Sequence, residues 1–195
     1  MNLSSPNRLV WTYFDSLRRM VKRIPTIQDP TEQKDEIVLS FVLAIAAVEV
    51  FVNLFFRVLV TEARFQQFNQ LVLDDLDTSQ AGGPKGLDHK LRHWPPKVLG
   101  KSLAWQKGGA KSFDEVRERR NALMHFTSSH QSIAFSNVTI QGLADTTAYD
   151  SLNVADAIKA LEVSEGMVAE LFRLRGISEA EIPRALHQWT GKVPI

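Results

Sequence analysis

The sequence predicts an all-α fold, a helical bundle of four to five main helices. Apolar side chains recur at the three- and four-residue spacing of a helix face along residues 6–24, 30–76 and 151–175. Clusters of Gly and Pro between these segments indicate loops, because both residues favour turns over regular structure. A chain of 195 residues is expected to bury one sizeable core. We therefore expect a single domain over residues 1–195, with its bundle core at about 34–175.

The first expected helix, residues 6–24, is basic. Ser5-Pro6 supplies a cap and a favoured first helical position, and Pro25 ends the segment. Charge runs on a helix usually face water, so we favour a solvated face over RNA contact here. The cationic side chains are Arg8, Arg18, Arg19, Lys22 and Arg23.

The second expected helix begins after Asp29-Pro30 and carries the most apolar stretch, residues 37–56. Twenty apolar residues are enough to cross a bilayer. However, Glu49 lies inside the stretch and Asn53 follows it, and polar groups on one stripe are costly in lipid. We therefore expect a helix of the protein core whose polar side chains face a site, and not a membrane span. A bend near Thr61 is expected before the helical pattern ends.

Shorter elements are expected in the middle of the chain. Residues 87–94 have a helical pattern that stops at Pro95-Pro96. Ser112 and Glu115 have the spacing of a capping box, which would start the next helix. Apolar and polar residues alternate over 133–140, which favours a short β-hairpin or an irregular flap.

The last long helix is expected at 151–175, with Gly176 as its stop. The tail, 177–195, contains Trp189 and is expected to pack back on the bundle. The inward face of the helix is predicted to consist of Val154, Ile158, Leu161, Val168, Leu171 and Phe172.

Composition narrows the classes of function. Lys plus Arg number 23 and Asp plus Glu 22, so only a local basic patch could favour nucleic acid. Cysteine is absent, which removes disulfides, thiolate catalysis and Cys-ligated zinc and fits a reducing cytosol. No apolar signal-peptide core follows Arg8. We therefore expect a cytoplasmic protein.

One arginine in the helix after residue 112 lies where an apolar side chain is expected. At 100° per residue, Phe113, Val116 and Leu123 all fall within about 60° of Arg120. An isolated buried charge is costly, so Arg120 must be paired or face a cleft. We expect Glu49 to be its partner, because it is the only carboxylate in the apolar stretch of the long helix.

His125 and Asn121 accompany this arginine. A guanidinium can bind phosphate oxygens, and an imidazole can move a proton near neutral pH, a combination suited to phosphodiester cleavage. His125 lies about 140° round the helix from Arg120. Either the arginine side chain swings toward it, or the same helix of a second chain completes the site. A structural ion pair and a histidine placed at a helix C-terminus are the alternative interpretation.

The sequence Arg120-Asn121-Ala122-Leu123-Met124-His125 resembles the R-X4-6-H motif of the HEPN superfamily, small helical proteins that include many RNases of toxin–antitoxin and phage-defence systems. Residues 34–175 are similar to the HEPN layout. The resemblance implies that Arg120 and His125 are catalytic, that Asn121 assists, and that Glu49 lies near the site. Arg119, with five residues before His125, fits the same motif. Phe126 departs from it, since a small residue or Pro is common there.

The resemblance implies metal-independent cleavage of RNA to 2′,3′-cyclic phosphate and 5′-hydroxyl ends, without a cofactor. It also implies a homodimer with both motifs in one groove, and an antitoxin or regulatory protein as a further partner. Many HEPN domains are binding modules instead. A non-catalytic helical dimer that binds a protein, RNA or a nucleotide is therefore the alternative.

A basic segment at residues 85–111 is the best local candidate for RNA contact, with tryptophans that either stack on bases or pack on the bundle. His89 and His93 have the i,i+4 spacing of a metal pair, but no third ligand is near in sequence, so we expect no metal site. The expected RNA-binding residues are Arg117, Arg119, Lys97, Lys101 and Trp105.

Overall fold

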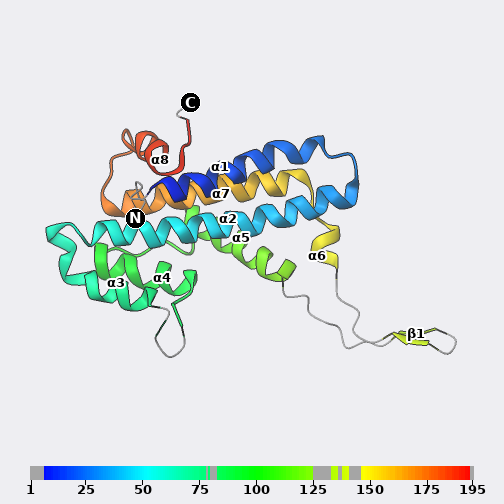
Figure 1. The fold of residues 1–195 in the computed structure, drawn as a ribbon, viewed down its shortest axis with the longest axis horizontal. Helices are drawn as coiled ribbons and strands as arrows, with labels where there is room; N and C mark the ends of the chain where they lie inside the picture. Colours follow the sequence, from blue (N-terminus) through cyan, green and yellow to red (C-terminus); the bar gives the residue numbers. More distant parts are fainter. Residues whose placement is uncertain are drawn as a thin grey trace.

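The computed structural model describes residues 7–77, 79, 83–124, 133–135, 138–140 and 146–193. The predicted all-α bundle is confirmed (Figure 1). Four helices are long and four are short. In chain order they are α1 (Asn7–Arg23), α2 (Pro30–Leu59), α3 (Asn69–Leu76), α4 (Leu87–Trp94), α5 (Gly108–Met124), α6 (Thr147–Asp150), α7 (Val154–Arg175) and α8 (Ile182–Thr190).

The long helices α1, α2 and α7 lie side by side, and α5 packs beneath α2 and α7 (Figure 1). Helix α8 contacts α1 and α7 at one end of the bundle, and α4 contacts α2 near the same end. The motif helix α5 therefore rests on the two longest helices of the fold.

Two groups of buried apolar residues hold these helices together. The larger one surrounds Phe51, Phe56 and Phe172, and it includes Trp94 from α4. The smaller one surrounds Ile37 and joins α1, α2, α5 and α7 near the start of α2. Burial of such side chains stabilises a fold by about 1.5–3 kcal/mol each before the entropy cost of folding. The bundle thus has continuous packing along the length of α2.

Helix α2 begins and ends as its sequence dictates. The Asp29 side chain accepts a hydrogen bond from the backbone N–H of Glu32 at 2.8 Å, and Pro30 takes the first helical position. The helix stops at Leu59, two residues before the expected bend at Thr61, and a 3-10 helix over Ala63–Phe68 leads into α3. Of the described helices, α2 alone is long and apolar enough to cross a membrane by length and composition.

Two helix ends differ from the sequence prediction. Helix α5 starts at Gly108, so the expected N-cap at Ser112 is wrong: the two glycines join the first turn instead of forming a loop. Helix α4 ends at Trp94 as expected, but a π-helical turn over Pro95–Leu99 continues it to Gly100, which has φ +68°. Because proline lacks an N–H, Pro95 and Pro96 cannot donate to the preceding turn, which interrupts the regular α-helical pattern there.

Helix α7 is capped at both ends. The Asn153 side chain accepts from the Ala155 N–H, and the Asp156 carboxylate accepts from the Asn153 N–H, which together form a capping box. Gly176, with φ +95°, ends the helix as predicted. Ile158 was expected to face inward but is 41% exposed, because no described element covers that side of the first turns.

Two three-residue strands, β1 (Ile133–Phe135) and β2 (Val138–Ile140), pair antiparallel in the segment expected to form a hairpin or flap. Ile133 is opposite Ile140, and Phe135 is opposite Val138. The tail forms α8, and Trp189 packs against Phe51 and Phe55 with ring centroids 5.5 and 5.8 Å apart.

Candidate functional site

Helix α5 buries the face that was predicted from its sequence. Phe113, Val116 and Leu123 are buried, and Arg120 lies half-buried on the same stripe. Met124, which helical geometry also places within about 40° of Arg120, is instead 46% exposed. The structure therefore places one cation among the apolar contacts of the helix.

The other two arginines of α5 are held by carboxylates. Arg117 contacts Asp114 and Asp88, each at 2.5 Å. Arg119 forms a two-point contact with Asp156 on α7, at 2.5 and 3.2 Å. Such paired hydrogen bonds fix a guanidinium in position as well as neutralise it. These two arginines were predicted to bind RNA, but their charges are already used within the fold.

Arg120 differs from both neighbours. Within the described part of the chain, no carboxylate lies within ion-pair distance of its guanidinium. Its Nη1 donates to the Asn121 side-chain oxygen at 3.1 Å, and its buried Nε, like that of Arg117, has no hydrogen-bond partner among the described residues. A half-buried cation without a counter-charge is costly, so this guanidinium is suited to an anionic ligand.

The expected ion pair between Glu49 and Arg120 is wrong. Glu49 contacts Lys90 of α4 at 3.5 Å. The reason is the position along α2 at which α5 crosses it. The Arg119 guanidinium lies 5.8 Å from the ring of Phe41, and Phe41 precedes Glu49 by eight residues, or about 12 Å of helix.

Lys90 was missed by sequence reasoning. Its side chain is only 2% exposed, although it belongs to the basic segment and follows the partly exposed His89. Its Nζ lies 5.8 Å from the centre of the Trp94 ring, so the aromatic face assists Glu49 in offsetting the charge. No local sequence signal distinguishes this lysine from the other cations of the basic segment.

Asp88 links the motif helix to α4. Burial opposes ionisation of this carboxyl, but the hydrogen bond from Arg92 and the nearby charge of Arg117 outweigh it, and the pKa of Asp88 is lowered. Glu49 and Lys90 then connect α4 to α2. A set of ion pairs therefore runs from α5 through α4 to α2 and leaves out Arg120.

His125 lies outside the described residues. In the sequence it follows Met124, the last residue of α5. Asn121, the third residue of the predicted site, is exposed and adjoins Arg120 through the hydrogen bond already described.

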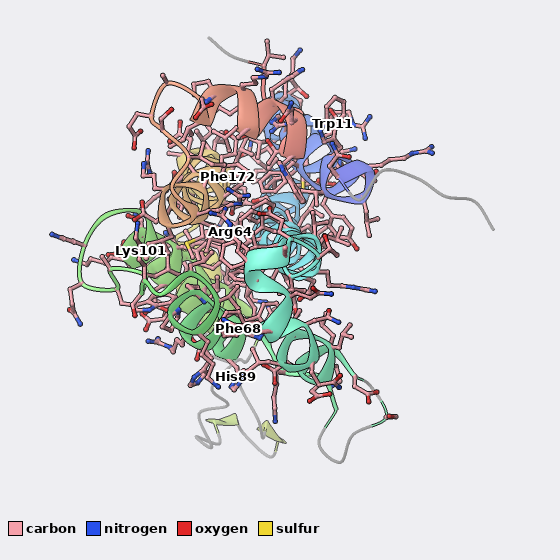
Figure 2. All side chains as sticks on the ribbon, turned by 90° about the vertical axis from the view of Figure 1, so that its left-hand side faces the viewer. Trp11, Arg64, Phe68, His89, Lys101 and Phe172 are labelled. Carbon is pink, nitrogen blue, oxygen red and sulfur yellow. The ribbon has the colours of Figure 1, made fainter. Side chains whose placement is uncertain are left out.

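Some side chains of the basic segment pack on the bundle, and others face solvent. Lys97 and Lys101 are exposed and form no ion pair with the described residues, and Figure 2 shows Lys101 pointing away from the bundle. Trp94 is buried and donates to Asp75 at 2.8 Å. The Arg92 guanidinium lies 4.5 Å from the ring centre of half-buried Trp105, so one face of this expected base-stacking ring is covered.

The two histidines of α4 contact each other, and one of them lies near a carboxylate. The rings of His89 and His93 are 4.2 Å apart, and His89 lies 3.5 Å from Asp75. Over the described ranges, no group of three or more His, Asp or Glu side chains is placed to hold a metal ion.

Comparison with known proteins identifies no relative of this chain. No family model, no characterised protein and no solved structure matches the chain.

Proposed function

We propose that the protein is a metal-independent endoribonuclease of HEPN type, with Arg120 and His125 as the catalytic pair. One observation carries the proposal. Of the three arginines on α5, Arg117 and Arg119 are neutralised by carboxylates, whereas Arg120 is half-buried with no carboxylate partner among the described residues. A phosphodiester would supply the missing negative charge. This contrast also favours Arg120 over Arg119 as the arginine of the motif.

In the proposed reaction, His125 removes the proton of the 2′-hydroxyl, whose oxygen attacks the adjacent phosphorus. The bond from phosphorus to the 5′-oxygen breaks, and that oxygen takes up a proton. Arg120 donates to the nonbridging oxygens, on which negative charge accumulates, and Asn121 keeps the guanidinium oriented. The products are a 2′,3′-cyclic phosphate and a 5′-hydroxyl. Proton transfer and charge stabilisation each contribute about 10²-fold or more in such sites.

The test is incubation of the purified protein with labelled RNA in EDTA, beside the same strand carrying 2′-O-methyl groups. We expect cleavage of RNA to cyclic-phosphate ends, no cleavage of the methylated strand, and loss of activity in His125→Ala. RNA binding without product would instead support the alternative, a binding module. Cleavage of the methylated strand would contradict the proposed nucleophile.

We further propose that the active form is a homodimer joined at the end of α5. A hollow of about 380 Å³ there is lined by Leu39, Leu123 and Met124, together with Tyr149. Leu39 is 50% exposed, and Met124 is one turn from Arg120. Adjacent exposed apolar side chains favour an interface. A two-fold axis at this patch would bring the two motif helices together, as a site completed by a second chain requires.

Leu39→Asp is expected to separate the dimer, because it places a charge within the apolar patch. Light scattering should give twice the 22.0 kDa chain mass for the natural protein and the single-chain mass for the variant. RNA cleavage should fall at least about tenfold, since half of each site is lost. The matched control is Leu73→Asp on α3, a similarly exposed leucine outside the patch. A monomeric natural protein that cleaves RNA would contradict the dimer.

A further inference from the structure

Helix α2 carries apolar side chains on the side that faces away from the bundle. Ala44 and Val48 are buried in the bundle, and Ala46 lies about 160° round the helix from each of them. Figure 1 looks onto this side of α2, and no other described helix lies in front of it. The half-buried or exposed apolar residues within about 60° of Ala46 form the outer face of α2: Leu39, Val42, Leu43, Ala46 and Val50.

This face is unusual for a helix at the surface of a bundle, which normally turns polar side chains to water. Only 44% of the 18 residues in the apolar stretch of α2 are buried. Between residues 39 and 54, however, Glu49 and Asn53 are the only polar residues besides buried Ser40. A contiguous apolar patch on a protein surface marks an interaction site. We therefore expect a second apolar surface to cover the outer face.

Charged residues of opposite sign lie at the two ends of the outer face. Asp35 precedes Ala46 by 11 residues and Arg57 follows it by 11, so each lies about 16 Å from Ala46 along the helix axis and within about 20° of its direction. Both side chains are exposed, and neither forms an ion pair with a described residue. The Asp35 carboxylate accepts a hydrogen bond from the Tyr149 hydroxyl at 2.8 Å. Two aspartates line a depression beside Arg57, but neither is within ion-pair distance of it.

We propose that the outer face of α2 binds the same face of a second copy of the chain, with the two helices antiparallel and a two-fold axis at Ala46. This arrangement places Asp35 of each chain beside Arg57 of the other, whereas parallel helices would place Asp35 against Asp35. The small side chain of Ala46 allows the helix axes to approach to about 8 Å where they cross. Val42 of each chain then packs against Val50 of the other.

Lipid is the alternative cover, because α2 is long and apolar enough to enter it. Glu49 and Asn53 argue against lipid, since polar groups are costly in hydrocarbon. An interface between two proteins tolerates such groups, because it contains about one hydrogen bond per 100–200 Å². The opposite charges at the two ends also favour a second copy, which offers the same two charges in reverse order.

Pairing through α2 has a consequence for catalysis that rests on the proposed function. It excludes the dimer joined at the end of α5, because both interfaces use Leu39. It also keeps the two motif helices apart. Helix α5 crosses near the start of α2, where Arg119 lies 5.8 Å from the ring of Phe41, and the two Leu39 residues would lie about 20 Å apart along the paired helices. The α2-paired dimer is therefore inactive toward RNA.

Disulfide trapping tests the pairing, because the natural chain has no cysteine and one introduced cysteine reports one contact. Two copies of Ala46→Cys would face each other at the two-fold axis, where the Cα atoms can reach the roughly 4–7 Å that a disulfide requires. We expect most chains to become crosslinked under mild oxidation, as measured on a non-reducing gel. The matched control is Leu73→Cys, an exposed position on α3 outside the outer face, which should remain uncrosslinked.

A charge reversal tests the antiparallel register. Arg57→Glu in the Ala46→Cys protein places two carboxylates together at each end, so the crosslinked fraction should fall about fivefold. Lys22→Glu, which changes an exposed cation of α1 in the same way, should leave it unchanged. Circular dichroism checks that each variant keeps the natural helicity. Crosslinked Ala46→Cys protein should cleave RNA at least about tenfold more slowly than the same protein after reduction.

Crosslinking through Ala46→Cys that is lost in Arg57→Glu supports the proposal. Equal crosslinking of Ala46→Cys and Leu73→Cys overturns it, and so does crosslinking that Arg57→Glu leaves unchanged. Partition of the natural protein into phosphatidylcholine vesicles, with no Ala46→Cys crosslink in their absence, would assign the outer face to lipid and also overturn it. Selective crosslinking in a protein that never cleaves RNA supports the pairing and contradicts only the nuclease.

Discussion

Replacement of Arg120 by Met is expected to lower the rate of RNA cleavage by about 10²- to 10³-fold without destabilising the fold. The loss follows from removing the group that stabilises charge on phosphorus. The free energy of unfolding should stay unchanged or rise by about 1 kcal/mol, because in the part of the chain that the structure describes the guanidinium has no carboxylate partner and its Nε has no acceptor. Initial rates in EDTA and urea titrations measure the two quantities on the same preparation.

Arg119→Met should show the opposite behaviour. This variant breaks the two-point contact with Asp156, so we expect the free energy of unfolding to fall by about 1–2 kcal/mol. RNA cleavage should remain within about threefold of the natural rate at a temperature where the variant is folded, because Arg119 is assigned no contact with the phosphate. A folded Arg119→Met protein without activity, beside an active Arg120→Met protein, would reverse the assignment of the two arginines.

Replacement of Asp156 by Ala is expected to cause a large loss of stability. The side chain is 12% exposed, and it both accepts from the Asn153 N–H and holds Arg119. Loss of a helix cap costs about 0.5–2 kcal/mol, and loss of a charged hydrogen bond costs about as much. We therefore expect a decrease of about 2–3 kcal/mol in the free energy of unfolding.

Thermal unfolding provides the measurement for Asp156→Ala. For a protein of this size, about 2–4 °C of Tm is lost per kcal/mol, so Tm should fall by about 5–10 °C. Asp156→Asn retains an acceptor for the cap and should lose less. The control is Glu162→Ala on the same helix, an exposed residue that forms no ion pair with the described chain and should shift Tm little. Equal Tm values for Asp156→Ala and the control would show that α5 is not fastened to α7 through this carboxylate.

The fold was predictable from the sequence because its helices have strong local signals. Asp29-Pro30 starts α2, and Gly176 stops α7, each through backbone chemistry confined to a few residues. The start of α5 was predicted wrongly, because two glycines were taken as a loop, whereas Gly108 (φ +66°) begins the helix and Gly109 packs on α7. The Cβ position of Gly109 lies only 3.5 Å from the carbonyl oxygen of Gly166, so the two helices approach closely there.

The site was predictable only in part. Helical angles placed Arg120 on the buried face of its helix, since that face depends on local periodicity. Which charged groups lie near Arg120 depends on where α5 crosses α2, and tertiary packing sets that position. The pairing of Glu49 with Lys90 therefore had no local signal. Asp156 did have one, because Asn153 and Asp156 have the spacing of a capping box.

The most direct test of the account is the response of the arginine side chains to a bound phosphodiester. The measurement is the ¹⁵N–¹H spectrum of arginine Nε groups during titration with 2′-O-methyl RNA, which lacks the attacking hydroxyl. Arg120→Lys, Arg119→Lys and Arg117→Lys identify the three signals of α5. We predict a large shift of the Arg120 signal, with the Arg117 and Arg119 signals held in place by their carboxylates. An unchanged Arg120 signal on RNA-saturated protein, or an equal shift of Arg119, would contradict the account.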